Sequence, residues 1–152
     1  MMAEPTRTVL FLCTGNYYRS RHAEVVFNHH AAAAGLEWRA TSRGLAPEFG
    51  VNNHGFMSRS TVARLAVLGI SHDEYLRLPA RVSESDFAAA EMVVALKEAE
   101  HRPLMVERHP VWVEKVVFWH VHDIDFATPD VALPQIEERV LELIAGSASP
   151  NG

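Results

Sequence analysis

Short runs of consecutive apolar residues alternate along the chain with longer segments in which apolar residues recur every three or four positions. A short continuous run is typical of a buried strand, and a period of three to four is typical of an amphipathic helix. The pattern predicts strands at residues 8–13, 38–41, 92–96 and 116–121. It predicts helices at residues 20–34 and 58–68, a short one opening at 83–87, a polar one from 97 and a last one from 129.

Strands separated by helical segments predict an α/β fold built on a parallel sheet. The length of 152 residues suits a single domain, with loose tails at residues 1–6 and 146–152. In parallel sheets, sites lie beyond the carboxyl ends of the strands. Polar residues follow all the predicted strands, so we expect one edge of the sheet to collect Cys13, Ser42, Arg43, Lys97 and Asp123.

Composition excludes several functional classes. The single cysteine, Cys13, excludes an internal disulfide framework and a cysteine-rich zinc site. The net charge of -5 argues against binding to a nucleic-acid backbone. No apolar run is long enough for a transmembrane helix, and residues 1–7 carry no signal-peptide pattern, so we expect a cytoplasmic protein with no membrane partner. The nine histidines form no complete ligand set, so neither a metal nor a cofactor is expected.

The segment after the first predicted strand carries the candidate chemistry. It places the thiol of Cys13 at a strand end and Arg19 six residues later, at a helix start. The intervening residues can curl around one tetrahedral anion, with backbone amides and the helix N-terminus as donors. Gly15 and Asn16 are the residue types that best tolerate left-handed backbone angles in such a loop. A thiolate at Cys13 would then face a bound phosphate as a nucleophile.

Residues 10–20 resemble the corresponding loop of the low-molecular-weight protein tyrosine phosphatases and their arsenate reductase relatives. The resemblance covers roughly residues 8–144, and it includes weaker matches at residues 41–44, 92–96 and 119–123. It implies a four-stranded parallel sheet with helices on both faces and an anion-binding loop after the first strand. It also implies hydrolysis in two steps through a phosphocysteine.

The resemblance implies a role for each matching residue. Cys13 would attack phosphorus, and Asp123 would protonate the leaving group and then activate water. Ser20 would donate to the Cys13 thiolate, and Asn16 would hold the loop shape with Ser42 as its partner. The phosphate would be bound by the loop residues Thr14, Gly15, Asn16, Tyr17, Tyr18, Arg19 and Ser20.

The sequence departs from the family pattern at several positions. Tyr18 replaces a second cysteine, so Cys13 has no resolving thiol in the chain. Tyr17 and Tyr18 either form a stacking wall for an aromatic substrate or pack against neighbouring loops. Arg21 replaces a proline and either adds positive field or is solvated. Asp123 lacks the usual following proline and has Asp125 as a competitor.

The segment 97–101 (Lys-Glu-Ala-Glu-His) leaves two interpretations open. It follows the third predicted strand, so it either lines the rim of the site or forms a solvated helix face.

Together these features predict a phosphomonoesterase that acts on aryl phosphates, in particular phosphotyrosine in proteins. The expected partners are a phosphotyrosyl protein or a small aryl phosphate, with inorganic phosphate and other oxyanions as ligands. The alternatives are an arsenate reductase that uses an external small thiol, and a phosphate-binding module without turnover.

Overall fold

The structure is a computed structural model, which describes residues 7–50, 53–121 and 127–147. The sheet is fully parallel and has the strand order β2-β1-β3-β4. Its strands are β1 (Arg7–Cys13), β2 (Trp38–Gly44), β3 (Met92–Ala95) and β4 (Val116–Phe118). The predicted four-stranded parallel sheet is therefore confirmed.

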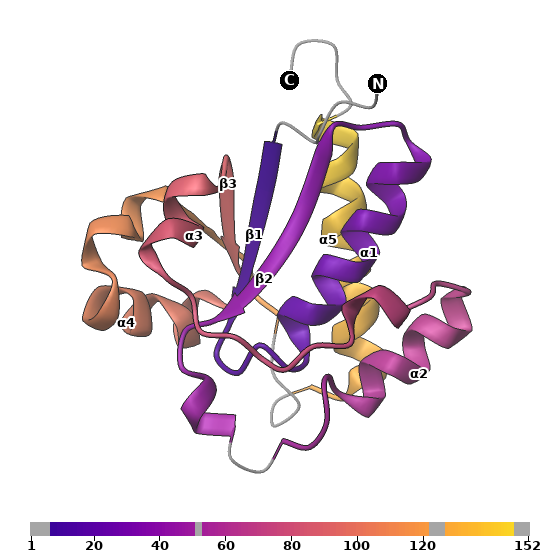
Figure 1. The fold of residues 1–152 in the computed structure, drawn as a ribbon, viewed down its shortest axis with the longest axis horizontal. Helices are drawn as coiled ribbons and strands as arrows, with labels where there is room; N and C mark the ends of the chain where they lie inside the picture. The colour runs from indigo at the N-terminus through magenta and orange to yellow at the C-terminus, as the bar shows by residue number, and fades with distance from the viewer. Residues whose placement is uncertain (1–6, 51–52, 122–126, 148–152) are drawn as a thin grey trace.

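Helices cover both faces of the sheet, as expected. The helices are α1 (Arg19–Ala33), α2 (Arg59–Leu68), α3 (Glu84–Ala89), α4 (Glu98–Arg108) and α5 (Pro129–Ser147). Figure 1 shows α1, α2 and α5 on one side of the strands, with α3 and α4 on the other. None of the helices in the described ranges is long and apolar enough to span a membrane.

Alternating side chains of β1 form the centre of two hydrophobic cores. Val9 and Phe11 point to the α1 and α5 side, where they pack with residues such as Phe27. Leu10 and Leu12 point to the α3 and α4 side. All these side chains are fully buried, so the central strand can be apolar on both faces, as the continuous run predicted.

Local signals explain where the shorter helices begin and end. Ser58 caps α2 by accepting a hydrogen bond from the Ser60 N–H, and Gly69 ends the helix at φ 72°. Ser83 and Asp86 form a reciprocal capping box at the start of α3.

Three boundaries differ by two or more residues from those predicted. β2 continues past residue 41 to Gly44, because it pairs with β1 along its full length. β4 ends at Phe118, although His120 still forms an antiparallel bridge with Lys97. The last helix continues through residues 146 and 147, which the sequence assigned to a loose tail, because the buried side chain of Ile144 anchors its final turns to the core.

Candidate active site

β1 delivers Cys13 to the carboxyl edge of the sheet, and the chain then turns through residues 14–18 into α1. The turn needs a left-handed residue, and Asn16 supplies it at φ 52°. Gly15 does not adopt a positive φ, so only one of the two residues predicted to be left-handed is so. Gly44 makes room for the turn, because a Cβ there would lie 3.0 Å from the Thr14 carbonyl oxygen and 3.1 Å from the Asn16 Cβ.

A buried polar chain connects the thiol to the second strand. The Cys13 Sγ lies 3.0 Å from the Ser20 Oγ, which accepts a 2.8 Å hydrogen bond from the Asn16 Nδ2. The same amide nitrogen donates to the Ser42 Oγ at 3.0 Å, and Ser42 donates to Glu24 at 2.6 Å. The structure thus brings together Cys13, Asn16, Ser20 and Ser42, which the sequence singled out.

The loop carbonyls are turned toward neighbouring segments. Four of them accept hydrogen bonds from backbone N–H groups at N···O distances of 2.8–3.0 Å. These carbonyls belong to Cys13, Thr14, Tyr17 and Tyr18, and their donors are Leu45, Ala46, Ser58 and His22. In a trans peptide the N–H points opposite to the carbonyl. The N–H groups of the following residues therefore point away from these neighbours.

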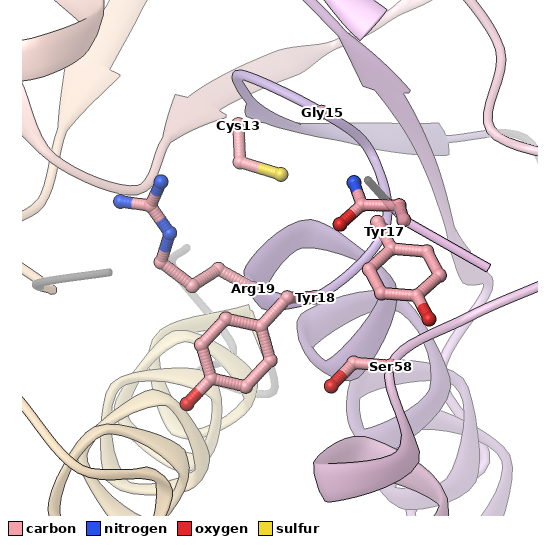
Figure 2. Close-up of a pocket in the computed structure, with 7 residues that line it drawn as sticks. Cys13, Gly15, Tyr17, Tyr18, Arg19 and Ser58 are labelled. Atoms are coloured by element: carbon pink, nitrogen blue, oxygen red, sulfur yellow. The ribbon is translucent and has the colours of Figure 1, made fainter. Parts of the chain in front are cut away.

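A cavity of about 190 Å³ opens over the thiol. Figure 2 shows the Cys13 sulfur with the guanidinium of Arg19 on one side and the ring of Tyr17 on the other, and with the ring of Tyr18 below the Arg19 side chain in this view. The lining residues are Cys13, Gly15, Tyr17, Tyr18, Arg19, Asn53 and Ser58.

The two tyrosines of the loop are fixed in different ways. Tyr18 is 8% exposed and packs into the core beneath α1, while its ring also lines the cavity. Tyr17 is half-buried, and its hydroxyl donates to the carbonyl of His54 on the opposite rim. Both are therefore packed and cavity-lining at once, rather than one or the other.

Arg19 is held on the far side of the cavity by two protein oxygens. Its side chain is 2% exposed, and one terminal nitrogen donates to the Val121 carbonyl at 3.1 Å. The other lies 2.7 Å from Glu100 Oε2, which also accepts a hydrogen bond from the Thr14 hydroxyl. Burial alone would raise the pKa of Glu100, but donors from His101 and Arg19 hold it well below its usual range.

Of the two alternatives for Arg21, the solvated one is wrong, because Arg21 is fully buried. Its guanidinium donates to the carbonyls of Asn16, Phe56, Tyr75 and Arg77, which belong to three different segments. Burial lowers the pKa of Arg21 to about 10, so the group stays charged near neutral pH. Its function in this structure is to tie loops together.

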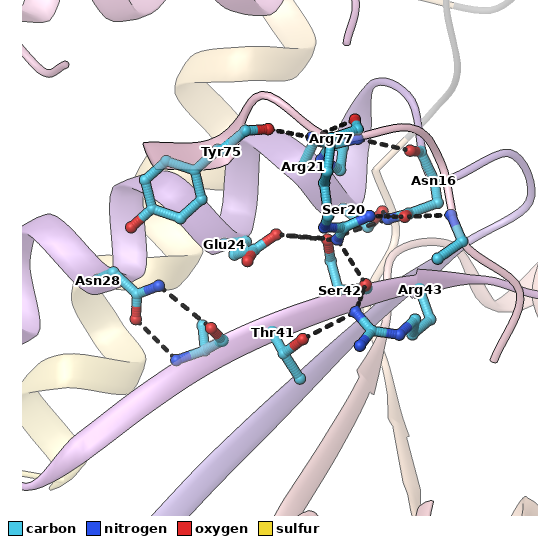
Figure 3. Close-up of polar contacts among 12 residues, drawn as sticks. Asn16, Ser20, Arg21, Glu24, Asn28, Thr41, Ser42, Arg43, Tyr75 and Arg77 are labelled. Atoms are coloured by element: carbon cyan, nitrogen blue, oxygen red, sulfur yellow. Dashed lines mark hydrogen bonds and ion pairs between the residues drawn. The ribbon is translucent and has the colours of Figure 1, made fainter. Parts of the chain in front are cut away.

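Arg77 contacts two members of the polar chain described above, Asn16 and Ser42, as Figure 3 shows. It donates to the Asn16 Oδ1 at 3.0 Å, to the Ser42 carbonyl at 2.9 Å and to the Ser42 Oγ at 3.1 Å. Sequence reasoning missed Arg77 because it lies more than thirty positions from Ser42 and in no recognised motif.

Some predicted residues lie elsewhere. The candidate acids Asp123 and Asp125 fall outside the described residues. Arg43 lies in β2 and pairs with Asp86 at 3.5 Å rather than with the loop. In the segment 97–101, Glu100 contacts the loop through Thr14 and Arg19, whereas Glu98 pairs with Arg102 on the exposed face of α4. No group of three or more His, Cys, Asp or Glu within the described ranges could hold a metal ion.

Comparisons with known proteins agree with this geometry. The sequence profile described as low molecular weight phosphotyrosine protein phosphatase matches residues 8–138. A comparison with curated proteins gives no match.

Several solved structures share the fold. YfkJ from Bacillus subtilis is 26% identical, with a TM-score of 0.77 and coverage of 92% of this chain and 93% of that one. The low molecular weight protein tyrosine phosphatase from T. tengcongensis is 29% identical, with a TM-score of 0.71 and coverage of 91% and 95%. A thioredoxin-dependent arsenate reductase from Corynebacterium glutamicum, at 19% identity, TM-score 0.69 and coverage of 96% and 64%, shares the fold alone.

The profile spans most of the chain, and the structure places the thiol of Cys13 at the end of β1, before the turn into α1. The chain belongs to the low-molecular-weight phosphotyrosine protein phosphatase family and is a hydrolase of that type.

Proposed function

We propose that the protein hydrolyses aryl phosphate monoesters, in particular phosphotyrosine in proteins, through a phosphocysteine intermediate. One observation carries the proposal. The Cys13 Sγ lies at the base of the cavity, 3.0 Å from the Ser20 Oγ, with the Arg19 guanidinium beside it. A nucleophile, a donor to that nucleophile and a cation that can hold a phosphoryl group therefore surround one small space.

The loop supplies the anion site. Its turned-out carbonyls leave the peptide N–H groups on the opposite side, and α1 adds the partial positive charge of its N-terminus. In this proposal the N–H groups from Thr14 to Ser20 and the Arg19 guanidinium bind the three non-bridging oxygens. Charge builds up on those oxygens in the transition state.

In the first step the Cys13 thiolate attacks phosphorus and forms the S–P bond while the P–O bond to the phenol breaks. Asp123 gives its proton to the departing phenolate oxygen. In the second step the same carboxylate takes a proton from water, whose oxygen bonds to phosphorus while the S–P bond breaks, so that inorganic phosphate and the Cys13 thiolate are released. Ser20 donates to the sulfur and makes it a better leaving group in that step.

The walls of the cavity support an aromatic substrate. The rings of Tyr17 and Tyr18 line the cavity beside the thiol, where a phenyl ring attached to the phosphate would contact them. The YwlE arginine phosphatase from Geobacillus stearothermophilus shares the fold at 20% identity, so phosphoarginine is the substrate to compare against. We expect kcat/KM for a phosphotyrosyl peptide to exceed that for the phosphoarginyl peptide of the same sequence.

The test is p-nitrophenyl phosphate hydrolysis and thiol-dependent arsenate reduction measured on one preparation of the full chain. We expect hydrolysis by the wild type and its loss in Cys13→Ser, with unchanged thermal unfolding as evidence that the variant is folded. Hydrolysis that survives in Cys13→Ser would exclude the nucleophile assignment. Arsenate reduction without hydrolysis would favour the reductase, and neither activity would favour a binding module.

A further inference from the structure

We propose that Glu100 limits the affinity of the loop for phosphate, because its carboxylate shares Arg19 with the bound anion. The inference rests on the proposed function, since it assumes that the loop binds phosphate. It assigns to Glu100 a positioning and charge-balancing role, not a place among the reacting groups.

The contacts of Glu100 converge on a single carboxylate oxygen. Its Oε2 lies 2.7 Å from a terminal nitrogen of Arg19 and accepts a hydrogen bond from the hydroxyl of Thr14, the first residue after Cys13. Glu100 therefore contacts both ends of the loop, through Thr14 at its beginning and Arg19 at its end.

His101 is a third group that contacts the Glu100 carboxylate. The fully buried His101 lies with its Nε2 3.1 Å from Glu100 Oε2. The Nδ1 of the same ring accepts a 3.0 Å hydrogen bond from the Lys97 N–H, so the ring proton is on Nε2, which faces the carboxylate. Glu100 also lies in the first turn of α4, where the helix dipole favours a negative charge. The carboxylate is thus a fixed charge of the site.

This arrangement has two electrostatic consequences for a bound dianion. The Arg19 side chain is 2% exposed, so water does little to screen its attraction to Glu100. The negative charge of Glu100 therefore reduces the positive potential that Arg19 presents to the phosphate. The phosphate must also lie close to a permanent negative charge. Both effects weaken phosphate binding relative to a loop that lacks Glu100, and both ease release of the phosphate product.

The substitution Glu100→Gln removes the charge and keeps the shape, with an amide oxygen that can still accept from Arg19. Glu98→Gln is its matched control. Glu98 lies in the same first turn of α4 and carries the same charge, but it pairs with Arg102 on the exposed face at 2.6 Å. Both variants change the net charge of the protein equally, so only the location of the charge differs.

The experiment measures the Kd of inorganic phosphate by calorimetry for the full-length wild type and both variants. We expect Glu100→Gln to bind phosphate at least about tenfold more tightly, because charges in a partly buried pair are screened much less than charges at the surface. Glu98→Gln should bind within about twofold of the wild type, since exposed charges are screened. Equal or weaker binding by Glu100→Gln would overturn the inference, as would equal tightening in Glu98→Gln.

A second comparison separates charge from shape. Sulfate and perchlorate are both tetrahedral, but sulfate is a dianion and perchlorate a monoanion. The gain in affinity from Glu100→Gln should be larger for sulfate than for perchlorate if the charge of Glu100 opposes binding. A purely steric change would move both affinities by the same factor, and that result would contradict the proposal.

Failure of the variant to fold would not block the test. Glu100→Asp and Glu100→Asn form a second isosteric pair that differs only in charge, and the Asn variant should bind phosphate more tightly than the Asp variant. Phosphate binding that is measurable but identical within both pairs would refute the role of Glu100 and leave the proposed function intact. Absence of phosphate binding in every protein would contradict the proposed function itself.

Discussion

The hydroxyl of Ser20 contacts the thiol of Cys13, and its two polar contacts define what it can do. It lies 3.0 Å from the Cys13 Sγ and accepts 2.8 Å from the Asn16 amide, so its own proton can be directed at the sulfur. Ser20→Ala should lower kcat for p-nitrophenyl phosphate by about 10²-fold, the size typical of losing one donor in a catalytic site. The measurement is steady-state and rapid-mixing hydrolysis.

The kinetics should also show which step is affected. If Ser20 makes the sulfur a better leaving group, the phosphocysteine should accumulate in Ser20→Ala, and p-nitrophenolate should appear in a burst. Ser58→Ala is the control, because Ser58 lines the same cavity but is hydrogen-bonded to Ser60 rather than to the thiol. A uniform slowing without a burst would show that Ser20 acts mainly on the first step.

The planar guanidinium group of Arg77 forms hydrogen bonds to both Asn16 and Ser42. Its Nη1 donates to the Asn16 Oδ1, while its Nη2 donates to the carbonyl and the hydroxyl of Ser42. A lysine cannot reproduce this geometry. Arg77→Lys should reduce the free energy of unfolding by about 1.5–3 kcal/mol, the usual value for hydrogen bonds to a charged group, and should lower kcat/KM because Asn16 loses support for its left-handed conformation.

Urea unfolding and p-nitrophenyl phosphate kinetics measure both effects. Arg81→Lys provides the comparison from the same segment, since Arg81 is 55% exposed and pairs with Glu48 at the surface. It should change neither quantity appreciably. A loss of stability without loss of kcat/KM in Arg77→Lys would show that the loop holds its shape without this arginine.

At the residue scale, three of the residues that the structure brings together around the thiol lie in one continuous motif. Cys13, Asn16 and Ser20 lie within eight positions of one another, so their chemistry is readable from their spacing. Glu100 and Arg77 reach the same loop from distant segments, and side chains of these types are usually solvated. Only their contacts in the folded chain identify them. The segment 97–101 gave a partial signal, since it follows a predicted strand at the edge where the loop lies.

At the scale of elements, the side chain of Arg21 connects α1 to the segments that precede and follow α2. Arg21, in its first turn, donates to the Phe56 carbonyl at 2.8 Å and to the Arg77 carbonyl at 3.1 Å, so it joins the segments before and after α2. Arg21→Met keeps the length and removes the donors. We expect it to lower the free energy of unfolding by about 3 kcal/mol, because buried carbonyls lose their partners.

Hydrogen exchange should show where the damage lies. Faster exchange is expected in residues 53–58 and 75–82, while β1 and β3 keep their protection. The control is Arg59, an exposed arginine at the first position of α2. Arg64 of the same helix is unsuitable as a control, because it forms an ion pair with Glu137. Arg59→Met should leave exchange in both segments unchanged. Uniform acceleration across the sheet in Arg21→Met would mean that Arg21 supports the whole fold.

The elements themselves were largely predictable, and their ends less so. Continuous apolar runs identify β1 and β3 because both are buried on both faces. The end of β2 was not predicted, since Ser42 and Arg43 are polar and their place in the strand depends on pairing with β1. Arg21 could not be assigned either, because its carbonyl partners come from segments whose positions follow from the fold as a whole.

At the scale of the whole molecule, a partly buried ion cluster joins three helices on one face of the sheet. Glu137 of α5 accepts two hydrogen bonds from Arg64 of α2, at 2.8 and 2.7 Å, and lies 2.9 Å from the His22 Nε2 of α1. Burial alone would raise the pKa of Glu137, but the bonds from Arg64 and His22 lower it from 4.5 to about 2. Burial also lowers the pKa of His22 below its ordinary 6.5.

Both shifts make the folded protein sensitive to acid. Below about pH 6.5 the His22 side chain is protonated in the unfolded chain but still neutral in the folded one. Protons therefore favour the unfolded chain, and the free energy of unfolding falls as the pH drops below about 6.5. Glu137 stabilises the fold above pH 4.5, and that contribution is lost as the pH falls toward about 2. Stability should therefore decline in two stages on acidification, and Glu137 contributes to the second stage together with other carboxylates of lowered pKa such as Glu100.

Glu137→Gln tests the second stage, because it removes the titrating group and keeps one acceptor for Arg64. The variant should be less stable than the wild type near neutral pH, and its free energy of unfolding should vary less between pH 4.5 and 2. Urea unfolding followed at a series of pH values measures both. Glu142→Gln changes the same charge on α5, where Glu142 is 60% exposed and meets Arg139 only at 3.9 Å, so its pH profile should parallel that of the wild type. Parallel profiles for all three proteins would mean that the three-helix cluster does not set the acid limit of the fold.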